Sequence, residues 1–435
     1  MTISKDEQEA IIGLIKRQVV PAIGCTEPIA VALCVAKARE LLGELPERID
    51  LRLSGNMLKN AMGVGIPGTG MIGLPIAVAL GALIGKSEYQ LEVLKDCNSE
   101  AVERGKEYIA GNRIHIDLEE NDPDKLYISV KCSAGEHETE AVIRSSHTNF
   151  IYLRRDEEVL LDESASTAAD TVEDEVQLTL RKVYDFATSV HIDDIRFILE
   201  TKHLDEKAAS EGLKENYGHR LGKTMCSPLG RGIMGDSIYA KIISKTSCAC
   251  DARMAGAMVP VMSNSGSGNQ GICTTMPVVV FAEENHNTEE ELIRALTLSN
   301  LTAIYIKQNL GRLSALCGCV VASTGSSVGI TYLMGGSYEQ MSFAVKNMVA
   351  NLTGMICDGA KPSCALKLTT GVGTAVMSAM LAIQNKSVSS LEGIVDDDVD
   401  QSIRNLTAIG SRGMDVTDRF VLDIMTHKTK SEKTV

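Results

Sequence analysis

The sequence predicts an α + α/β fold, in which a mainly helical domain carries a small inserted α/β domain. Apolar and polar residues alternate in several short stretches between residues 46 and 160, which is the pattern of strands with one buried face. Outside that region apolar residues recur at helical spacing. We therefore expect helices in residues 1–45 that pack with the helical domain, an inserted α/β domain in residues 46–160, and the helical domain itself in residues 175–425.

The first helices are expected between residues 5 and 43, with an interruption at residues 21–24. Before the interruption, apolar residues follow helical spacing at Ile11, Leu14, Ile15 and Val19. After it, Thr26 is suited to the N-cap position and Gly43 is suited to end the helix. The pattern predicts two helices separated by a short non-helical segment.

The inserted domain is predicted from five alternating stretches and one helix-prone block. The stretches are residues 48–54, 113–118, 125–131, 139–144 and 151–154. A Gly-rich, helix-prone block at 56–110 separates the first two strands, which together predict a small α/β unit. The acidic, Ser/Ala-rich stretch 162–175 is predicted to be a linker.

Beyond the linker the pattern is almost entirely helical. The candidate helices are residues 176–188, 193–201, 288–308, 338–352 and 374–385. The most apolar stretch of the chain, residues 71–84, contains Gly and Pro and is shorter than the roughly 20 residues that a membrane helix needs. We therefore expect a buried segment there and no membrane partner.

Composition excludes several function classes. The formal net charge is −14 and aromatic residues make up 4% of the chain, with no Trp. Nucleic-acid binding needs a basic face and is often helped by aromatic stacking, so no nucleic-acid partner is expected. The N-terminus carries acidic residues and lacks the apolar core of a secretory signal, which predicts a cytoplasmic protein.

The 12 cysteines indicate metal binding or catalysis, because disulfides are rare in the cytosol. Cys357 and Cys364 flank a turn-forming segment that contains Gly, Lys, Pro and Ser, and Cys317 precedes them in the same domain. Three such thiolates would hold an iron–sulfur cluster with one iron left open to substrate. The alternatives are buried free thiols and a zinc site, although no suitably spaced His accompanies the cysteines.

Three motifs together resemble the L-cysteine desulfidase family, which is related to the α chain of iron–sulfur L-serine dehydratases. They are Val-Pro-Ala-Ile-Gly-Cys-Thr-Glu-Pro at 20–28, Ser-Asn-Ser-Gly-Ser-Gly-Asn-Gln-Gly-Ile at 263–272, and Gly-Met-Ile-Cys-Asp-Gly-Ala with a following Cys at 354–364. The resemblance implies that the helical domain is catalytic and eliminates the β-substituent of L-cysteine, a small amino acid, yielding pyruvate, ammonia and hydrogen sulfide.

The resemblance also assigns roles to particular residues. Cys317, Cys357 and Cys364 would bind a four-iron, four-sulfur (4Fe–4S) cluster whose open iron acts as a Lewis acid, and Cys25 would be the base that removes the α-proton. The position of Cys25 near a helix start would favour its thiolate. The related dehydratases imply a homodimer.

Two polar loops are candidates for substrate binding. Ser146, His147, Thr148 and Asn149 lie in a segment similar to the Ser-Ser-His-Thr loop with which serine dehydratases hold the substrate carboxylate. The Gly-rich segment with Asn264, Ser265, Asn269 and Gln270 would offer side chains and backbone N–H groups to an anion. The alternatives are a polar turn that closes a strand and a flexible loop.

Three other functions remain open from the sequence. An L-serine dehydratase would use the same site, since the motifs do not distinguish sulfur from oxygen leaving groups. A pyridoxal-phosphate lyase would use Lys59 for its Schiff base. A non-enzymatic iron–sulfur sensor would need a partner-binding module, and the sequence shows no basic DNA-reading helix. The Gly-rich segment 63–68 is not predicted to bind a dinucleotide, because no strand directly precedes it and Pro67 interrupts it.

Overall fold

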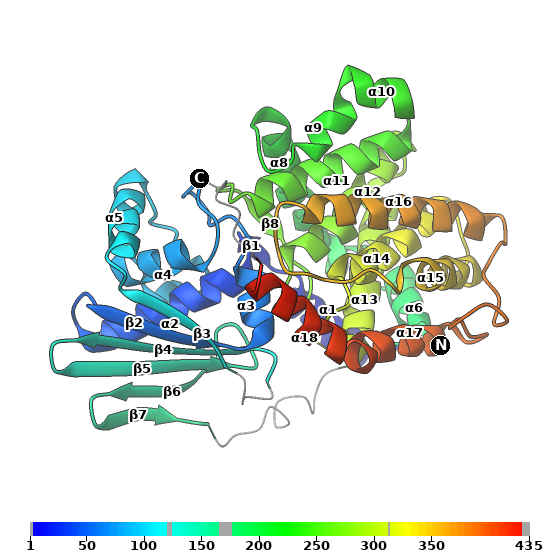
Figure 1. The fold of residues 1–435 in the computed structure, drawn as a ribbon. Helices are drawn as coiled ribbons and strands as arrows, with labels where there is room; N and C mark the ends of the chain where they lie inside the picture. The colour runs from blue at the N-terminus through cyan, green and yellow to red at the C-terminus, as the bar shows by residue number, and fades with distance from the viewer. Residues whose placement is uncertain (1–2, 120–123, 165–175, 312–313, 429–435) are drawn as a thin grey trace.

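The computed structural model describes residues 3–119, 124–164, 176–311 and 314–428. It confirms the predicted α + α/β fold. A six-stranded sheet with its helices forms one unit, and a larger bundle of helices forms the other (Figure 1). Each unit has its own cluster of buried apolar side chains. The predicted linker at 162–175 lies mostly outside the described residues.

The sheet has the strand order β3-β2-β4-β5-β6-β7. The strands are β2 (Arg48–Leu53), β3 (Ile114–Leu118), β4 (Tyr127–Ala134), β5 (His137–Arg144), β6 (Phe150–Arg155) and β7 (Glu158–Asp162). β2 and β3 are parallel, and every other neighbouring pair is antiparallel. A parallel pair needs a long crossover, which here contains α3 (Gly55–Ala61), α4 (Leu74–Leu83), a 3-10 turn (Ser87–Glu92) and α5 (Ser99–Ala110). The sequence predicted five of these strands and missed β7.

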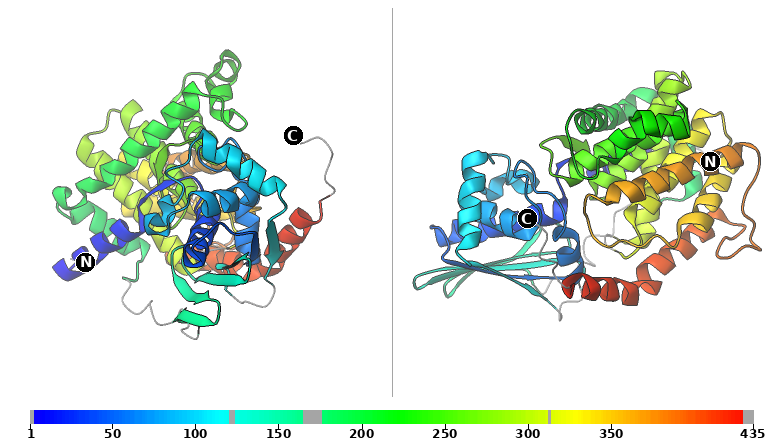
Figure 2. Two further views of the ribbon diagram at one scale, coloured as in Figure 1. Left: turned by 90° about the vertical axis from the view of Figure 1, so that its left-hand side faces the viewer. Right: turned by 45° about the horizontal axis from the view of Figure 1, so that its top comes forward.

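One face of the sheet is covered by α2 (Thr26–Leu42) and α4, and no helix of the described residues lies on the opposite face (Figure 2, right). α2 is apolar around nearly its whole circumference, with buried residues from Thr26 to Ala36. A helix with that pattern must be enclosed on all sides. Residues 1–45 were expected to pack together with the helical domain, but α2 belongs to the core of the sheet unit. Only α1 (Lys5–Gln18) joins the helical core, through Ile11, Leu14 and Ile15.

The helical unit is arranged around α14 (Gly318–Leu333), which contacts four other long helices. They are α12 (Gly268–Glu284), α13 (Glu289–Leu310), α15 (Tyr338–Leu352) and α16 (Cys364–Ile383). α14 is rich in Gly and Ser, and small side chains allow neighbouring helices to approach closely. A Cβ on Gly325 would lie 2.3 Å from the carbonyl oxygen of Ser299 on α13.

The remaining elements surround this centre. They are α6 (Leu180–Ser189), α7 (Ile192–Ile195), a 3-10 turn (Arg196–Ile198), α8 (Leu199–Lys214), α9 (Leu221–Cys226), α10 (Pro228–Met234), α11 (Ile238–Met254), α17 (Val399–Ala408), a π-turn (Ile409–Gly413) and α18 (Asp415–Thr426). The sequence predicted the bounds of α15 correctly. It placed the start of α16 at residue 374, whereas that helix begins at Cys364.

The interruption predicted at residues 21–24 is a short strand. β1 (Pro21–Ile23) pairs antiparallel with β8 (Pro260–Met262), and Ser263 donates its backbone N–H to Val20 at 2.8 Å. This pair ties the chain before α2 to the loop before α12, so two predicted motifs far apart in sequence become neighbours.

Within the described residues, α16 alone has the length and hydropathy of a membrane span, and 56% of that stretch is buried inside the protein. It packs against α11, α14 and α15, as a core helix of the bundle does.

Candidate active site

Cys25 and Glu27 form a buried thiol–carboxylate pair at the start of α2. Cys25 occupies the N-cap position, one residue earlier than the predicted cap, and its Sγ donates to Oε2 of Glu27 at 2.8 Å. Asn60 on α3 donates from Nδ2 to Oε1 of Glu27 at 3.0 Å, and Thr26 Oγ1 lies 3.2 Å from Oε2. Cys25 is 4% exposed and Glu27 is 9% exposed. Both carboxylate oxygens therefore have partners.

The backbone before this pair requires glycine. Gly24 has a φ of +72°, and a Cβ at this position would lie 2.4 Å from Cγ of Pro67. Only glycine adopts this conformation without strain in so little space. The carbonyl of Gly24 accepts a hydrogen bond from the buried guanidinium of Arg253 at 2.9 Å, which holds the turn against α11.

The environment of Cys25 corrects the expectation that it is a thiolate near neutral pH. Burial and the adjacent Glu27 carboxylate raise the pKa of Cys25 well above its usual value, and the opposing effect of Arg253 is smaller. Burial acts to raise the pKa of Glu27, but His147, the Cys25 hydrogen bond and Arg253 outweigh it, and that pKa is lowered. At neutral pH the carboxylate is charged and the thiol keeps its proton.

The loop after β5 brings His147 to this pair. His147 acts electrostatically on Glu27, and a Cβ on Gly266 would lie 3.9 Å from Cε1 of His147. Ser146 and Thr148 are partly buried in the same loop. Asn149 is exposed, and its side-chain amide donates to the carbonyl of Arg144 at 3.2 Å, so this amide closes the loop.

The Gly-rich loop before α12 divides into two parts. Asn264 is fully buried, and its Nδ2 donates to Oδ1 of Asn300 on α13 at 2.9 Å. Ser265 Oγ donates to Oδ1 of Asn264 at 2.9 Å. These two side chains hold the loop in the helical core and are engaged by the protein itself.

The second part of the loop, with Asn269 and Gln270, lies between Arg253 and the segment that contains Cys317. Asn269 Oδ1 accepts from Arg253 at 3.0 Å. Gln270 is 4% exposed, and a Cβ on Gly318, the residue after Cys317, would lie 3.2 Å from Cδ of Gln270. The amide of Gln270 therefore lies against the first turn of α14, and its Oε1 has no hydrogen-bond partner.

The structure brings Cys317, Cys357 and Cys364 together from three segments. Cys317 is the N-cap of α14, and Cys364 is the first residue of α16. The segments around Cys317 and Cys357 pair through the Leu316–Ile356 bridge, with Cys357 N–H donating to Ala315 at 2.6 Å. A helix N-terminus favours negative charge, and two of these sulfurs lie at such ends.

The three thiols influence one another and lie among lysines. Burial, together with the nearby Cys317 and Cys364, raises the pKa of Cys357 to about 11, although Lys59 acts in the opposite direction. A hydrogen bond with Cys319 lowers the pKa of Cys317 to about 7.

The neighbouring lysines are held in place. Lys367 pairs with Asp358 and donates to the carbonyl of Ile356 at 2.6 Å, and Lys361 bonds the carbonyl of Asp358 at 2.8 Å. Cationic side chains near three thiols stabilise thiolates, which are the form that ligates metals.

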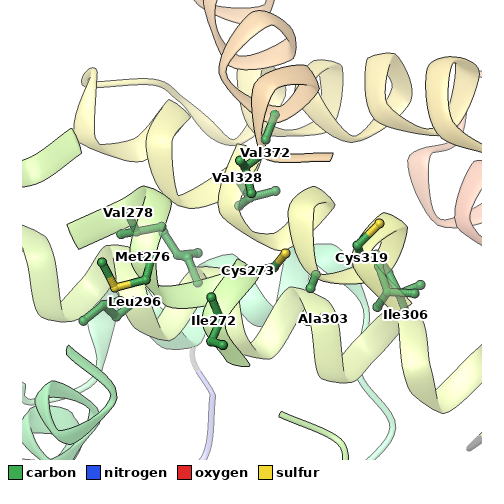
Figure 3. Close-up of a cluster of buried hydrophobic side chains, with 14 of the residues drawn as sticks. Ile272, Cys273, Met276, Val278, Leu296, Ala303, Ile306, Cys319, Val328 and Val372 are labelled. Atoms are coloured by element: carbon green, nitrogen blue, oxygen red, sulfur yellow. The ribbon is translucent and has the colours of Figure 1, made fainter. Parts of the chain in front are cut away.

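Two other cysteines are packed as small apolar residues. Cys273 lies beside Ile272 in the helical core (Figure 3), and Cys34 on α2 is fully buried in the core of the sheet unit. The free-thiol interpretation fits these two residues. Cys319 is also buried in the helical core, but its thiol hydrogen-bonds Cys317, and Cys357 and Cys364 are only partly buried.

In the described part of the chain, no group of three His, Cys, Asp or Glu side chains is arranged to hold a single metal ion. In a 4Fe–4S cluster each thiolate binds a separate iron, so its ligands do not converge on one point. Two of the three thiols lie at helix N-termini, the third lies in a paired loop, and lysines lie near all three. This arrangement fits such a cluster.

Sequence reasoning missed two residues of this site. Glu27 lies inside the N-terminal motif but was given no role there, and Arg253 was not singled out. Asn60 was predicted, together with Asn56 and Lys59, to face the active site, and it contacts Glu27. A Glu two residues after a Cys at a helix start is a usable signal for a thiol–carboxylate pair. No local signal identifies Arg253, because its partners Gly24 and Asn269 come from other segments.

The candidate site contains a buried thiol–carboxylate pair and three cysteines suited to an iron–sulfur cluster. Arg253 and the turn at 268–270 connect the two groups. These are the groups that we expect in an iron–sulfur lyase. Residues 88–423 match the family described as serine dehydratase alpha chain. The chain belongs to this family, and its membership points to a lyase of the serine dehydratase type.

The similar proteins span nearly the whole chain. A UPF0597 protein of Bacteroides fragilis is 66% identical over 98% of this chain and 99% of its own length. One of Phocaeicola vulgatus is 67% identical with the same coverage. One of Actinobacillus pleuropneumoniae is 41% identical over 99% of this chain and 100% of its own length.

Proposed function

We propose that this chain is an iron–sulfur lyase that catalyses β-elimination of L-cysteine to pyruvate, ammonia and hydrogen sulfide. The observation that carries the proposal is the grouping of Cys317, Cys357 and Cys364 beside the loops that lead to Cys25. Membership of the serine dehydratase family supports the reaction type. The choice of cysteine rests on the resemblance of the three motifs to the cysteine desulfidases.

In this proposal Cys317, Cys357 and Cys364 hold a 4Fe–4S cluster. A cluster with three protein ligands supplies an open, Lewis-acidic iron next to the substrate. His147 lies against Gly266 of the loop before α12. Together with Ser146 and Thr148 of the same loop, it is proposed to bind the substrate carboxylate, because these residues offer a ring and two hydroxyl groups. Gln270 is proposed as a further polar contact through its unpartnered Oε1.

Cys25 is the proposed acceptor of the α-proton. It follows the tight turn at Gly24 and is the N-cap of α2, so its position is defined by the backbone rather than by a flexible loop. The helix α2 that it begins belongs to the core of the sheet unit, whereas Cys25 itself packs with the helical core that also contains Cys317. The substrate would bind between Cys25 and the three ligand candidates.

L-serine dehydratase is the second candidate, and the family match favours it directly. Family membership also favours an enzyme over an iron–sulfur sensor. The pyridoxal-phosphate alternative is disfavoured because the ammonium of Lys59 is buried in an ion pair with Asp418, whereas a Schiff-base lysine must be free to react as a neutral amine.

The test is pyruvate release from L-cysteine and from L-serine by anaerobically reconstituted protein. We expect kcat/KM for L-cysteine to exceed that for L-serine. Cys357→Ala should lose both bound iron and turnover, whereas Cys226→Ser, at an exposed cysteine of α9, should retain both. Turnover of serine alone would refute the substrate assignment, and full activity of Cys357→Ala without iron would refute the cluster.

A further inference from the structure

Cys25, the proposed base, needs a second group to take the proton of its own thiol. A neutral thiol is a very weak base, and Cys25 is held neutral because it is buried beside a charged carboxylate. To accept a proton from substrate carbon, its sulfur must lose the proton that it already carries. The only described atom that accepts a hydrogen bond from that thiol is Oε2 of Glu27, at 2.8 Å.

We propose that Glu27 is the positioning residue and proton acceptor that makes Cys25 basic, so that the substrate α-proton moves to Sγ as the thiol proton moves to Oε2. This inference rests on the proposed β-elimination and adds a residue to it. No free thiolate has to exist beforehand, because the two proton transfers are coupled.

The step balances without any further reactant. The Cα–H bond breaks and an S–H bond forms on Cys25, while the original S–H bond breaks and an O–H bond forms on Glu27. The electron pair of the Cα–H bond becomes the Cα–Cβ double bond, and the leaving group departs with the electron pair of its bond to Cβ. Glu27 then returns its proton to the departing group or to water, which restores the carboxylate.

The surroundings of Glu27 fit an acceptor that is charged at rest. His147 comes from the loop after β5 and Arg253 from α11, and both favour the carboxylate. From α3, Asn60 contributes a neutral amide that holds Oε1 at 3.0 Å and leaves Oε2 to Thr26 and the thiol. Oε1 is thus held by Asn60, and Oε2 accepts the hydrogen bond from Cys25.

The experiment compares Glu27→Gln with Glu40→Gln, a control on the last turns of the same helix whose side chain bonds Ser87. Both variants should keep their iron content. Glu27→Gln should lower kcat by about 10²–10⁴-fold, the usual contribution of a positioned proton acceptor. Its residual kcat should rise about tenfold per pH unit, because the thiol must then ionise by itself, whereas the wild-type and Glu40→Gln profiles should stay flat near neutral pH.

Alkylation of Cys25 by iodoacetamide, located by mass spectrometry, gives a readout that does not depend on turnover. Loss of the Glu27 charge should make the thiolate easier to form, so Glu27→Gln should be alkylated faster than wild type at pH 8 although it turns over more slowly. Glu27→Asp should recover part of kcat. A flat pH profile with wild-type kcat in Glu27→Gln would overturn the inference, and so would unchanged alkylation.

The two proposals fail differently. If wild-type protein eliminates neither cysteine nor serine, the proposed function is wrong and the catalytic role of Glu27 falls with it. If wild type is active and Glu27→Gln is equally active, only the role of Glu27 is wrong.

Discussion

Replacing Asp418 with alanine is expected to destabilise the protein by far more than the loss of an ordinary surface charge. Asp418 lies on α18 and pairs with Lys59 on α3; the two side chains are 11% and 1% exposed. Asn56 also donates to Asp418, at 2.7 Å. Without the carboxylate, the ammonium of Lys59 stays buried with no opposite charge.

The expected loss is about 3–5 kcal/mol, the cost of removing one partner from a buried ion pair. Replacing both partners, Lys59→Met with Asp418→Leu, should recover most of it, because no uncompensated charge is then buried. Asp423→Ala on the same helix is the control, since that carboxylate is 64% exposed, and its effect should stay within about 0.5 kcal/mol.

The assay is urea unfolding followed by circular dichroism, with the midpoint and slope compared among the four proteins. Since Lys59 also acts on Cys357, iron content after reconstitution is measured in parallel, so that a change at the cysteines is distinguished from a change in stability. A loss below about 1 kcal/mol for Asp418→Ala, or a double variant no more stable than the single one, would refute this reasoning.

Three further predictions concern the site and its supports. Cys25→Ala should keep its iron and lose turnover by about 10²-fold or more; an active variant would place the base elsewhere. Gly271→Ala should cost at least about 1–3 kcal/mol in urea unfolding, because the new Cβ would lie 1.7 Å from the carbonyl oxygen of Met262, whereas Gly232→Ala meets no atom within 4 Å and should be tolerated. Burial raises the pKa of Asp205 to about 8, so the folded protein keeps a proton that the unfolded chain loses near pH 4. That contribution to stability is complete below about pH 4 and is lost as pH rises to about 8, at about 1.4 kcal/mol per pH unit. Asp205→Asn should flatten this decline in unfolding midpoints between pH 5 and 8, and equal slopes in both proteins would contradict it.

The strands of the inserted unit were predictable because alternation of polar and apolar residues is a local signal. β2, β4 and β5 lie within three residues of their predicted bounds. β1 and β8 were not predicted, since three-residue strands carry no period and form only because their partner is present. The assignment of α2 to the helical domain was wrong for a related reason. The apolar circumference of α2 shows that the helix is buried, but it does not show which of the two cores encloses it.

The candidate site divides in the same way. The types of its chemical groups, namely the three ligand cysteines, Cys25 and the polar loops, were recognisable from motifs in the sequence. The sequence did not reveal that Asn264 is engaged by Asn300, or that Arg253 joins two loops, because such contacts link residues distant along the chain.

By itself the sequence determined the fold class and predicted the groups of the candidate site and the cysteines suited to a cluster, because local pattern and residue chemistry suffice for these predictions. Only the tertiary structure showed the surroundings of the Cys25 thiol, which raise its pKa. A helix N-terminus favours a thiolate, yet burial and the Glu27 carboxylate prevail, because removal of water strengthens the interaction between neighbouring charges and penalises a second negative charge.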